Sequence, residues 1–576
     1  MKIGNQQIKN QQINKSTNQQ MKPSATLCFM LAVMALLAIL MTIFPKDGIS
    51  VSDDLKLYFP DFKEWWADDG KSKNGGNTFI PEMVEEDKKK FANADTTAVA
   101  DTLKNADTLM VADMSGVPTF DSSVYAFKPR PIQIDSIRQP LELPASGLGC
   151  LKTLFDALTN PDELSKVVRI VHYGDSQIEV DRISGYLRYK LQQQFGGSGP
   201  GLIPAKTAYD YPSPCKVVNI GDWRRYTVFP FIDTAVHHTK YGILAAFTRF
   251  SPLTTATTAA PKTEPKKEDS PFMTVTVETD STTADTTDSV QLPSTIVNIP
   301  KYTPPPPPKQ VYSGQLEFEI PSFGYSNTKI VKKFRMIYGG NTSSFEAKVM
   351  DGEQILYAET FAPNSFYGIK TWNFAQTPAN FRMEFSGTDS PDIYGFAMDG
   401  LSGVAVDNVP LRGCSGTIFT KINAVQLGQM YRDLNVKCII LQFGGNAVPA
   451  LNPENVVSFK NYLAAQIRYL RRIHPGVSII LIGPADMSQK VQDEYVTYEI
   501  LPEEVRLLRE AAFQNDCAYW DMFAAMGGEN TMPDWVFHDP PFAEKDFIHF
   551  TQTGANAMAK MFYNALIARY NQYIRR

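Results

Sequence analysis

Two separated parts of the chain alternate apolar stretches with amphipathic helical patterns, and this alternation restricts the fold more than any other feature. The first part is an apolar run at 167–173 followed by a helical pattern over 178–195. The second part begins after Gly413 and predicts, in chain order, a helix at 418–434, a strand at 438–443, a helix at 453–473, a strand at 477–482, a helix at 502–515, a strand at 517–520 and a helix at 554–570. Strands separated by helices form parallel sheets that are covered on both faces. The sequence therefore predicts an α/β fold with a five-stranded, doubly wound parallel sheet.

A segment with a different sequence pattern, from residue 216 to residue 400, separates these two parts. Short stretches there alternate apolar and polar residues with a period of two, at 273–279, 315–320, 333–338, 345–350, 354–358 and 380–385. Such stretches predict antiparallel strands, and six of them predict a β-sandwich. A segment rich in Thr and Pro at 251–310 predicts an exposed loop or linker. We therefore expect a β-sandwich inserted into the α/β domain after its first helix.

The segment 25–44 is uncharged and would span about 30 Å as a helix, which is the thickness of a bilayer's hydrocarbon core. The first acidic residue is Asp47, and the charged residues before the segment are Lys2, Lys9, Lys15 and Lys22. The positive-inside rule thus predicts a cytoplasmic tail at 1–24, a single-pass inner-membrane anchor at 25–44, and a body on the periplasmic side. A cleaved signal peptide is the alternative.

Composition excludes several classes of protein. The 576 residues are 43% hydrophobic, too apolar for a wholly disordered chain, and their net charge of −5 argues against a nucleic-acid partner. The six cysteines form no Cys-x-x-Cys pair and lie near no histidine at ligand spacing, so we expect no metal and no other cofactor. The expected segments are the tail at 1–24, the anchor at 25–44, a polar stalk at 45–147, the first part of the α/β domain at 148–215, the inserted module at 216–400 and the second part of the α/β domain at 401–576.

Ser176 is the candidate nucleophile. It ends Gly-Asp-Ser directly after the first predicted strand, so we expect it at the carboxyl edge of the sheet, beside a helix amino terminus that favours developing negative charge. The candidate base is His549, which lies in the Asp-x-x-His of residues 546–549, just before the last predicted helix. This spacing lets Asp546 orient the imidazole toward the serine. The alternatives are a helix-capping role for Asp-Ser and a polar loop before the last helix.

Two loop positions are candidate donors to a tetrahedral oxyanion. Gly413 follows the apolar stretch at 403–406 and would offer a backbone N–H, and Asn446 follows the strand at 438–443 and would offer its side-chain amide. Ordinary turn chemistry also explains both positions. The other glycines that compete with Gly413 are Gly221, Gly403 and Gly416.

The order of these four blocks resembles the SGNH (GDSL-type) hydrolase family, over about 148–215 and 400–576. The resemblance implies that Ser176 is the nucleophile, that His549 is the base, that Asp546 orients the base, and that Gly413, Asn446 and the Ser176 N–H form the oxyanion hole. Two neighbouring positions depart from the family's common pattern, because Gln177 follows the serine and Ala447 follows the asparagine.

The long insertion between the first two blocks resembles the arrangement in peptidoglycan O-acetylesterases, whose inserted β domain is similar to a carbohydrate-binding module. This resemblance implies a membrane-anchored esterase that removes O-acetyl groups from peptidoglycan or another envelope polysaccharide through an acetyl-serine intermediate. An O-acetyltransferase with the same triad, partnered by a multi-pass membrane acyltransferase, is one alternative. An inactive glycan-binding envelope protein is another. The aromatic residues of the insert that would either stack on sugar rings or fill its core are Trp223, Tyr226, Phe366, Tyr367 and Trp372.

Overall fold

The computed structural model describes residues 49–52, 55–57, 130–209, 212–253, 272–273, 299–300, 310–321 and 324–576. The expected tail and anchor, most of the stalk and most of the Thr- and Pro-rich segment lie outside these residues. Within the described ranges, no helix combines the length and the apolar character needed to span a bilayer. The chain divides into two units, and the first comprises residues 1–78. In this unit, strand β1 (Ile49–Ser52) pairs with strand β2 (Leu55–Leu57) as an antiparallel hairpin.

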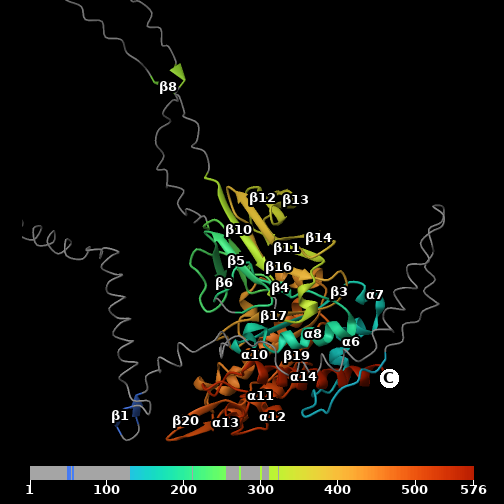
Figure 1. Cartoon of the computed structure of the whole chain (residues 1–576), viewed down its shortest axis with the longest axis vertical. Coiled ribbons are helices and arrows are strands. Elements are labelled where there is room, and N and C mark those ends of the chain that lie inside the picture. The colour runs from blue at the N-terminus through green and yellow to red at the C-terminus, as the bar shows by residue number, and fades with distance from the viewer. Residues whose placement is uncertain are drawn as a thin grey trace, which may run out of the picture. The chain divides into compact units, whose positions relative to one another are not determined.

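The second unit, residues 79–576, contains a five-stranded parallel sheet (Figure 1). Its strands, in order across the sheet, are β17 (Gly403–Pro410), β3 (Val167–Gly174), β18 (Val436–Gln442), β19 (Ser478–Ile482) and β22 (Ala518–Trp520). Every neighbouring pair runs parallel. The first of these strands in the chain is second in the sheet, which is the flavodoxin-like order, and the predicted five-stranded parallel sheet is confirmed.

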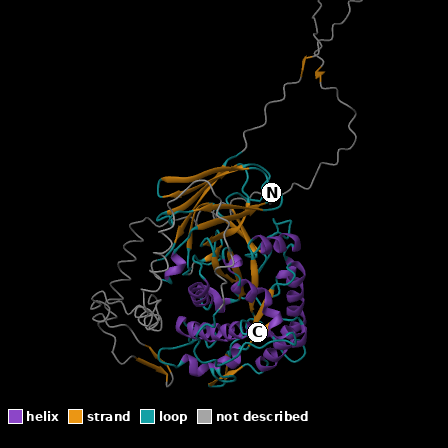
Figure 2. Ribbon diagram, turned by 90° about the vertical axis from the view of Figure 1, so that its right-hand side faces the viewer, coloured by secondary structure: helices purple, strands orange, loops and turns teal. Residues whose placement is uncertain are grey.

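Helices cover both faces of this sheet because its strands send alternate side chains to opposite sides. On β3, Val168 and Ile170 join one buried cluster, and Val171 and Tyr173 join another. The first cluster includes side chains of α6 (Lys152–Thr159), α8 (Ser184–Phe195) and α14 (Gln552–Tyr573); the second includes side chains of α9 (Ala424–Asp433), α10 (Val456–Ile473) and α11 (Leu501–Gln514). Shorter helices lie in the connections: α7 (Pro161–Leu164), α12 (Met522–Met526) and α13 (Met532–Val536). Figure 2 shows the helices in purple, gathered in one half of the unit.

Two antiparallel sheets form the other half. One has the order β13 (Gln354–Phe361), β12 (Phe345–Asp351), β15 (Phe381–Gly387), β10 (Tyr312–Glu319) and β5 (Lys216–Gly221). The other has the order β14 (Gly368–Asn373), β11 (Lys333–Gly339), β16 (Asp392–Asp399), β7 (Ala246–Arg249) and β6 (Arg224–Thr227), and β4 (Gly201–Ile203) also pairs with β16. Side chains from both sheets share one buried cluster, as in a two-sheet sandwich. Of the predicted strand at 273–279, only its first residue is described, in β8 (Phe272–Met273), which pairs with β9 (Ile299–Pro300).

The structure corrects two boundaries that were expected from composition. The antiparallel pairing begins at β4, before residue 216, because the alternation in this short strand is too brief to show in the sequence. The expected stalk ends earlier than residue 147, since residues 130–147 pack against other parts of the second unit, to which they belong. Ile132 and Ile134 pack against the buried cluster that includes α14, and the backbone of Glu142 bridges to Tyr519 of β22.

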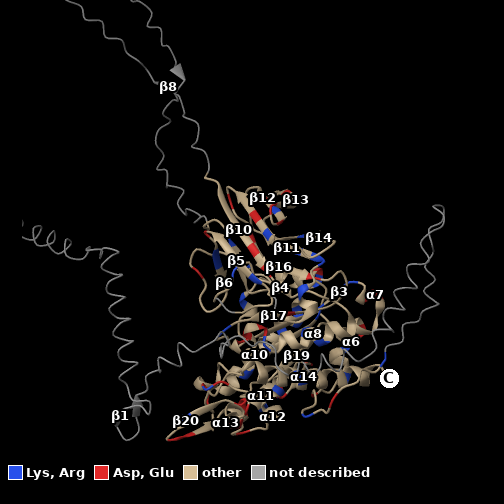
Figure 3. Ribbon diagram, in the orientation of Figure 1, with Lys and Arg blue, Asp and Glu red and all other residues tan. Residues whose placement is uncertain are grey.

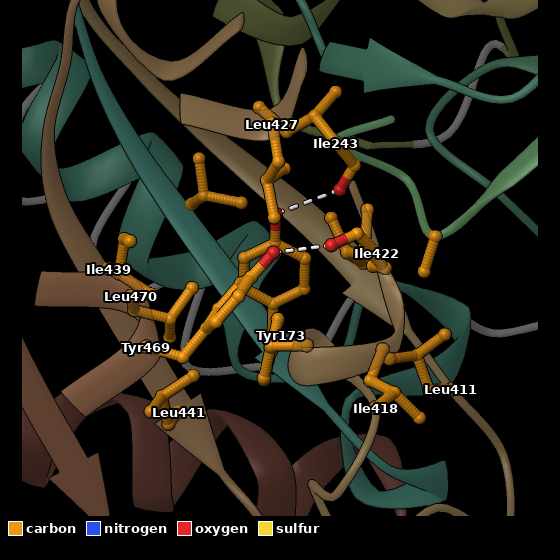
Figure 4. Close-up of a cluster of buried hydrophobic side chains, with 14 of the residues drawn as sticks. Tyr173, Ile243, Leu411, Ile418, Ile422, Leu427, Ile439, Leu441, Tyr469 and Leu470 are labelled. Atoms are coloured by element: carbon orange, nitrogen blue, oxygen red, sulfur yellow. Dashed lines mark hydrogen bonds between the residues drawn. The ribbon is translucent and has the colours of Figure 1, made fainter. Parts of the chain in front are cut away.

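The parallel and antiparallel sheets share a buried core. Tyr173, at the end of β3, is fully buried and donates its hydroxyl to the backbone oxygen of Ile243 at 2.8 Å (Figure 4). Leu411, directly after β17, packs in the same cluster. Because Ile243 lies just before β7, the core runs across the junction between the two kinds of sheet.

A buried ion network crosses the same junction. Arg169 of β3 pairs with Asp407 of β17 and, at 2.5 Å, with Asp399 of β16. Arg335 of β11 also reaches Asp399, at 2.9 Å. Elsewhere acidic and basic residues are interspersed over the helices and the antiparallel strands (Figure 3).

Candidate active site

The nucleophile candidate stands at the carboxyl edge of the parallel sheet. Strand β3 ends at Gly174, whose carbonyl accepts the Leu411 N–H at 2.8 Å, and Ser176 begins the 3₁₀ helix η2 (Ser176–Asp181). The Asp175 carboxylate accepts the Gln177 N–H at 2.9 Å and so caps this helix. Asp175 therefore caps the helix that the adjacent, partly buried Ser176 begins.

Ser176, His549 and Asp546 form a continuous hydrogen-bonded relay. The Ser176 Oγ lies 2.8 Å from His549 Nε2, and His549 Nδ1 lies 2.7 Å from Asp546 Oδ2. The loop that carries the last two residues precedes α14, which Thr551 caps by accepting the Gly554 N–H at 3.2 Å. The loop before the last helix thus holds both a helix cap and two residues of the relay.

The environment of Asp546 favours its charged form. Burial acts against ionisation, but hydrogen bonds from the His549 ring and from the backbone N–H groups of His549 and Ile548 outweigh it and lower the pKa of Asp546 to about 2. The two backbone bonds reach Oδ1, each at 3.0 Å. A carboxylate that stays ionised and fixed in this way holds the imidazole with Nε2 toward the serine.

Gln177 connects the serine segment to the histidine loop. Its Nε2 donates to the Ile548 carbonyl at 2.6 Å, and its Oε1 accepts the Phe550 N–H at 3.4 Å. These two backbone groups flank His549 on either side. The sequence showed this residue as a departure from the family pattern but gave no sign of its function, since its partners lie more than 370 residues away in the chain.

Asn446 lies beside the relay and beside the turn that contains Gly413. Its side-chain amide donates to the carbonyl of Cys414 at 3.4 Å, and it also bonds to the buried carboxylate of Asp175. Ser176, Asn446 and His549 line one cavity of about 160 Å³. The other residues around this cavity are Asp175, Gln177, Gln442, Phe443, Gly445, Pro449, Pro484, Ala485, Met487, Met522 and Ile548.

The structure excludes two of the three glycines that were alternatives to Gly413 as an oxyanion donor. Gly403 pairs with Val167 at the opposite, amino edge of the sheet, and Gly221 lies in the antiparallel strand β5. Gly416 shares the turn after β17 with Gly413, but its N–H donates to Cys414 Sγ at 3.3 Å. Within the part of the chain that the structure describes, the Gly413 N–H makes no such hydrogen bond. Its role as an oxyanion donor remains a prediction, because it does not line the cavity around Ser176.

Two buried carboxyl groups lie behind the relay. Burial raises the pKa of Asp175 to about 6, although the Gln177 N–H, His549 and Asn446 favour its charged form. Burial, together with the nearby charge of Asp175, raises the pKa of Glu504 on α11 to about 8. Within the described residues neither carboxyl oxygen of Glu504 has a hydrogen-bond partner. Glu504 lies close to Gly444, at the start of the Gly-Gly-Asn loop.

The remaining histidines have other environments. His172 is fully buried in β3, where burial lowers its pKa to about 3 and its Nε2 lies 3.1 Å from Gln442 Oε1. His238 lies 3.3 Å from Asp392, and His474 from α10 donates to the Val436 carbonyl at 2.8 Å. Among the described residues, no group of three or more His, Cys, Asp or Glu side chains is arranged to hold a metal ion.

Most of the aromatic residues considered for sugar contact are core residues instead. Trp223, Tyr226 and Trp372 are buried in the antiparallel sheets, whereas Phe366 and Tyr367 are partly exposed. The sequence missed Tyr209, which is 51% exposed, and Phe231, which is 83% exposed. The period of two along a strand shows which side chains share a face, but not which face a second sheet covers.

Comparisons with known proteins agree with this geometry at the level of the family. Residues 386–557 match the GDSL-like Lipase/Acylhydrolase family, a range that holds Gly413, Asn446, Asp546 and His549 and begins after Ser176. No curated protein matches the chain.

Several solved structures are similar at low identity. A peptidoglycan O-acetylesterase is 18% identical, with a TM-score of 0.49, over 76% of this chain and 99% of that one. The acetyl xylan esterase AlAXEase is 14% identical, with a TM-score of 0.23, over 28% of this chain and 81% of that one. A family two carbohydrate esterase from Cellvibrio japonicus is 11% identical, with a TM-score of 0.21, over 46% of this chain and 92% of that one.

Proposed function

We propose that this chain, which belongs to the GDSL-like lipase/acylhydrolase family, is a serine esterase that removes O-acetyl groups from peptidoglycan or another envelope polysaccharide. The observation that carries the proposal is the relay from Asp546 through His549 to the Ser176 Oγ, with its two contacts of 2.7 and 2.8 Å. A serine whose proton has a positioned acceptor is the central requirement of acyl transfer by this class of enzyme.

The first half of the proposed reaction acylates the serine. The Ser176 Oγ attacks the acetyl carbonyl carbon while His549 Nε2 takes the hydroxyl proton, and the Asp546 carboxylate stabilises the imidazolium that forms. The carbonyl oxygen becomes negatively charged, and the N–H groups of Ser176 and Gly413 and the amide of Asn446 are the proposed donors to it. When the tetrahedral intermediate collapses, His549 returns the proton to the departing sugar oxygen.

The second half releases acetate. A water molecule attacks the acetyl-Ser176 carbonyl, and His549 takes its proton as the same donors stabilise the second tetrahedral intermediate. The bond to Ser176 Oγ then breaks, and the serine recovers its proton from His549. The residues return to their starting protonation states, so the cycle consumes one water per ester.

The lining of the cavity around Ser176 supports an acyl substrate. Pro449, Pro484, Ala485 and Met487 give it apolar walls, which suit an acyl methyl group.

The proposal of an anchored, periplasmic enzyme rests on the uncharged segment 25–44 and the four lysines before it. If it is right, the protein should stay with membranes after washing at high pH, and protease added to spheroplasts should digest its body. A variant lacking residues 1–44 expressed in the same cells would serve as the control. Recovery of the full chain in the soluble fraction would contradict an uncleaved anchor.

Substitution of Ser176 by alanine tests the chemistry directly. With a chromogenic acetate ester, Ser176→Ala should reduce kcat by at least 10³-fold, because the acyl-enzyme cannot form. Undiminished hydrolysis by Ser176→Ala protein would rule out the serine mechanism. The second measurement uses acetylated glycan and a separate acceptor oligosaccharide: acetate as the product supports the esterase, and acetylated acceptor would establish a transferase.

A further inference from the structure

A second cavity, of about 110 Å³, lies where the α/β elements meet the antiparallel sheets. One wall comes from η2 and from the end of β17, including Glu179 and Arg412. The facing wall comes from the segments around β4, β6 and β7, including Tyr209, Phe229 and Pro230. The cavity thus exists because the β sheets are inserted beside the carboxyl edge of the parallel sheet.

The second cavity and the catalytic cavity share one chain segment, the 3₁₀ helix η2, and the second cavity is also lined by the turn that contains Gly413. Glu179 lies in the same 3₁₀ helix as Ser176, three residues further on, and Arg412 directly precedes Gly413. The Phe229 ring lies 3.9 Å from the position that a Cβ on Gly413 would occupy. A molecule bound in the second cavity would therefore lie next to the turn proposed to hold the oxyanion.

The mouth of the second cavity combines a fixed cation with an exposed aromatic ring. The Arg412 guanidinium lies 4.8 Å from the centroid of the Tyr209 ring. Its Nε and Nη2 donate to the carboxylate of Glu179, at 2.9 and 2.6 Å. The Glu179 side chain is only 3% exposed, so a buried carboxylate holds an arginine whose own side chain is 54% exposed.

Apolar surface continues beyond this mouth. Phe231 follows directly after Phe229 and Pro230 in the chain and is 83% exposed, and Ile232 beside it is also exposed. Exposed aromatic surface next to a cavity marks ligand-binding grooves, because leaving it in water is unfavourable. Rings with exposed faces beside a fixed hydrogen-bond donor suit pyranose sugars, which have an apolar face and polar edges.

We propose that this second cavity binds a sugar unit of the glycan strand that carries the scissile acetyl ester, with the sugar face against Tyr209 and with Arg412 donating to its hydroxyl or carboxylate oxygens. The inference rests on the proposed function. During the reaction the acetyl group occupies the small cavity around Ser176, so the alcohol part of the ester must lie outside it. The second cavity is an adjoining concave surface with the chemistry to hold that part.

The test compares a polymeric substrate with a small one. Tyr209→Ala, Tyr209→Phe and Tyr462→Ala proteins are assayed on soluble O-acetylated peptidoglycan strands and on a chromogenic acetate ester. Tyr462 is an exposed tyrosine on α10 and serves as the matched control. We expect Tyr209→Ala to lower the ratio of kcat/KM for the strands to kcat/KM for the small ester by at least 10-fold. Tyr209→Phe keeps the ring and should restore the ratio, and Tyr462→Ala should leave the ratio as it is.

The other outcomes either overturn the sugar site or show that the proposed esterase function, on which it rests, is wrong. An unchanged ratio in Tyr209→Ala overturns the sugar site, and so does an equal loss on both substrates, which would mean that Tyr209 has a structural role. If the unaltered enzyme hydrolyses neither ester, the proposed function fails. The binding of peptidoglycan strands to Ser176→Ala protein then tests whether the second cavity is a sugar site. Weaker binding when Tyr209→Ala is added supports a sugar site, and equal binding rules it out.

Discussion

At the scale of the single residue, Gln177 determines how the two halves of the relay meet. Its side chain bonds to the Ile548 carbonyl and the Phe550 N–H, while its own backbone N–H is held by Asp175. The serine and the histidine are thereby tied together through groups that do not react. A residue of this kind acts through His549 and is a positioning residue.

Replacing Gln177 with leucine should slow catalysis more than it weakens substrate binding. The change keeps the size of the side chain but removes both hydrogen bonds, each worth about 1 kcal/mol, so kcat should fall roughly 10-fold or more. Steady-state kinetics with a chromogenic acetate ester, together with a melting curve, would measure this. The control is Gln514→Leu, at an exposed amide on α11. A normal kcat in Gln177→Leu protein would show that these two hydrogen bonds are not needed for catalysis.

Glu504 should make the stability of the protein depend on pH. The pKa of its carboxyl group is about 8 in the folded protein, against an ordinary value of 4.5. Between these values the unfolded chain releases a proton that the folded chain keeps, so the free energy of unfolding falls by about 1.4 kcal/mol per pH unit at most. The Glu504 contribution is intact below pH 4.5 and is lost as the pH rises through 8.

Glu504→Gln removes this dependence because glutamine cannot ionise. The melting temperature of the variant minus that of the unaltered protein should therefore be larger at pH 8 than at pH 5. Glu503→Gln provides the control on the same helix, since Glu503 is exposed and its hydrogen bond to Arg506 lowers its pKa. An equal difference at both pH values would show that Glu504 is not held neutral in the folded protein.

At the scale of secondary-structure elements, the network around Arg169 connects four strands from two kinds of sheet. Arg169→Met would leave Asp399 and Asp407 buried without their shared cation. Removing one partner of a buried pair typically costs about 3–5 kcal/mol, so urea unfolding should show a loss of that size. Arg506→Met, which breaks an exposed pair on α11, should cost less than about 1 kcal/mol. Similar losses in both variants would contradict a structural role for the network.

At the scale of the whole molecule, the antiparallel sheets and the parallel sheet should unfold together. One buried cluster contains side chains from both, and Tyr173 of β3 bonds directly to the segment before β7. Neither part can therefore lose its structure without exposing the core of the other. Calorimetry should record a single cooperative transition for residues 130–576 within the full chain, whereas two separate transitions would indicate independent folding of the insert.

The parallel sheet could be predicted from the sequence because burial on both faces produces continuous apolar runs, as in β3 and β18. The relay could be predicted because three of its features are local: Gly-Asp-Ser after a strand, Asp-x-x-His, and the capped helix that follows. The exclusion of Gly403 as an oxyanion donor needed the structure, since only the register of β17 against β3 shows that it lies at the wrong edge of the sheet.

Other features could not be predicted because they depend on pairing between distant segments. Gln177 and Arg412 owe their functions to partners that no local pattern reveals, and the packing of residues 130–147 rests on a few isoleucines and leucines in a polar stretch. The anchor at 25–44 remains a prediction, since it lies outside the described residues. Tyr209 and Trp223 both lie in loops between strands, and the exposure of the first and the burial of the second follow from the packing of the assembled molecule.

The separation of the relay along the chain has a consequence for the timing of synthesis. Ser176 and His549 are 373 residues apart. At about 5–20 residues per second, a ribosome makes the histidine roughly 20–75 s after the serine. During that interval the serine has neither its base nor the Asp546 that orients it. A nascent chain, or one cut short before Asp546, therefore lacks the relay, and hydrolysis can begin only after nearly the whole polypeptide has been made.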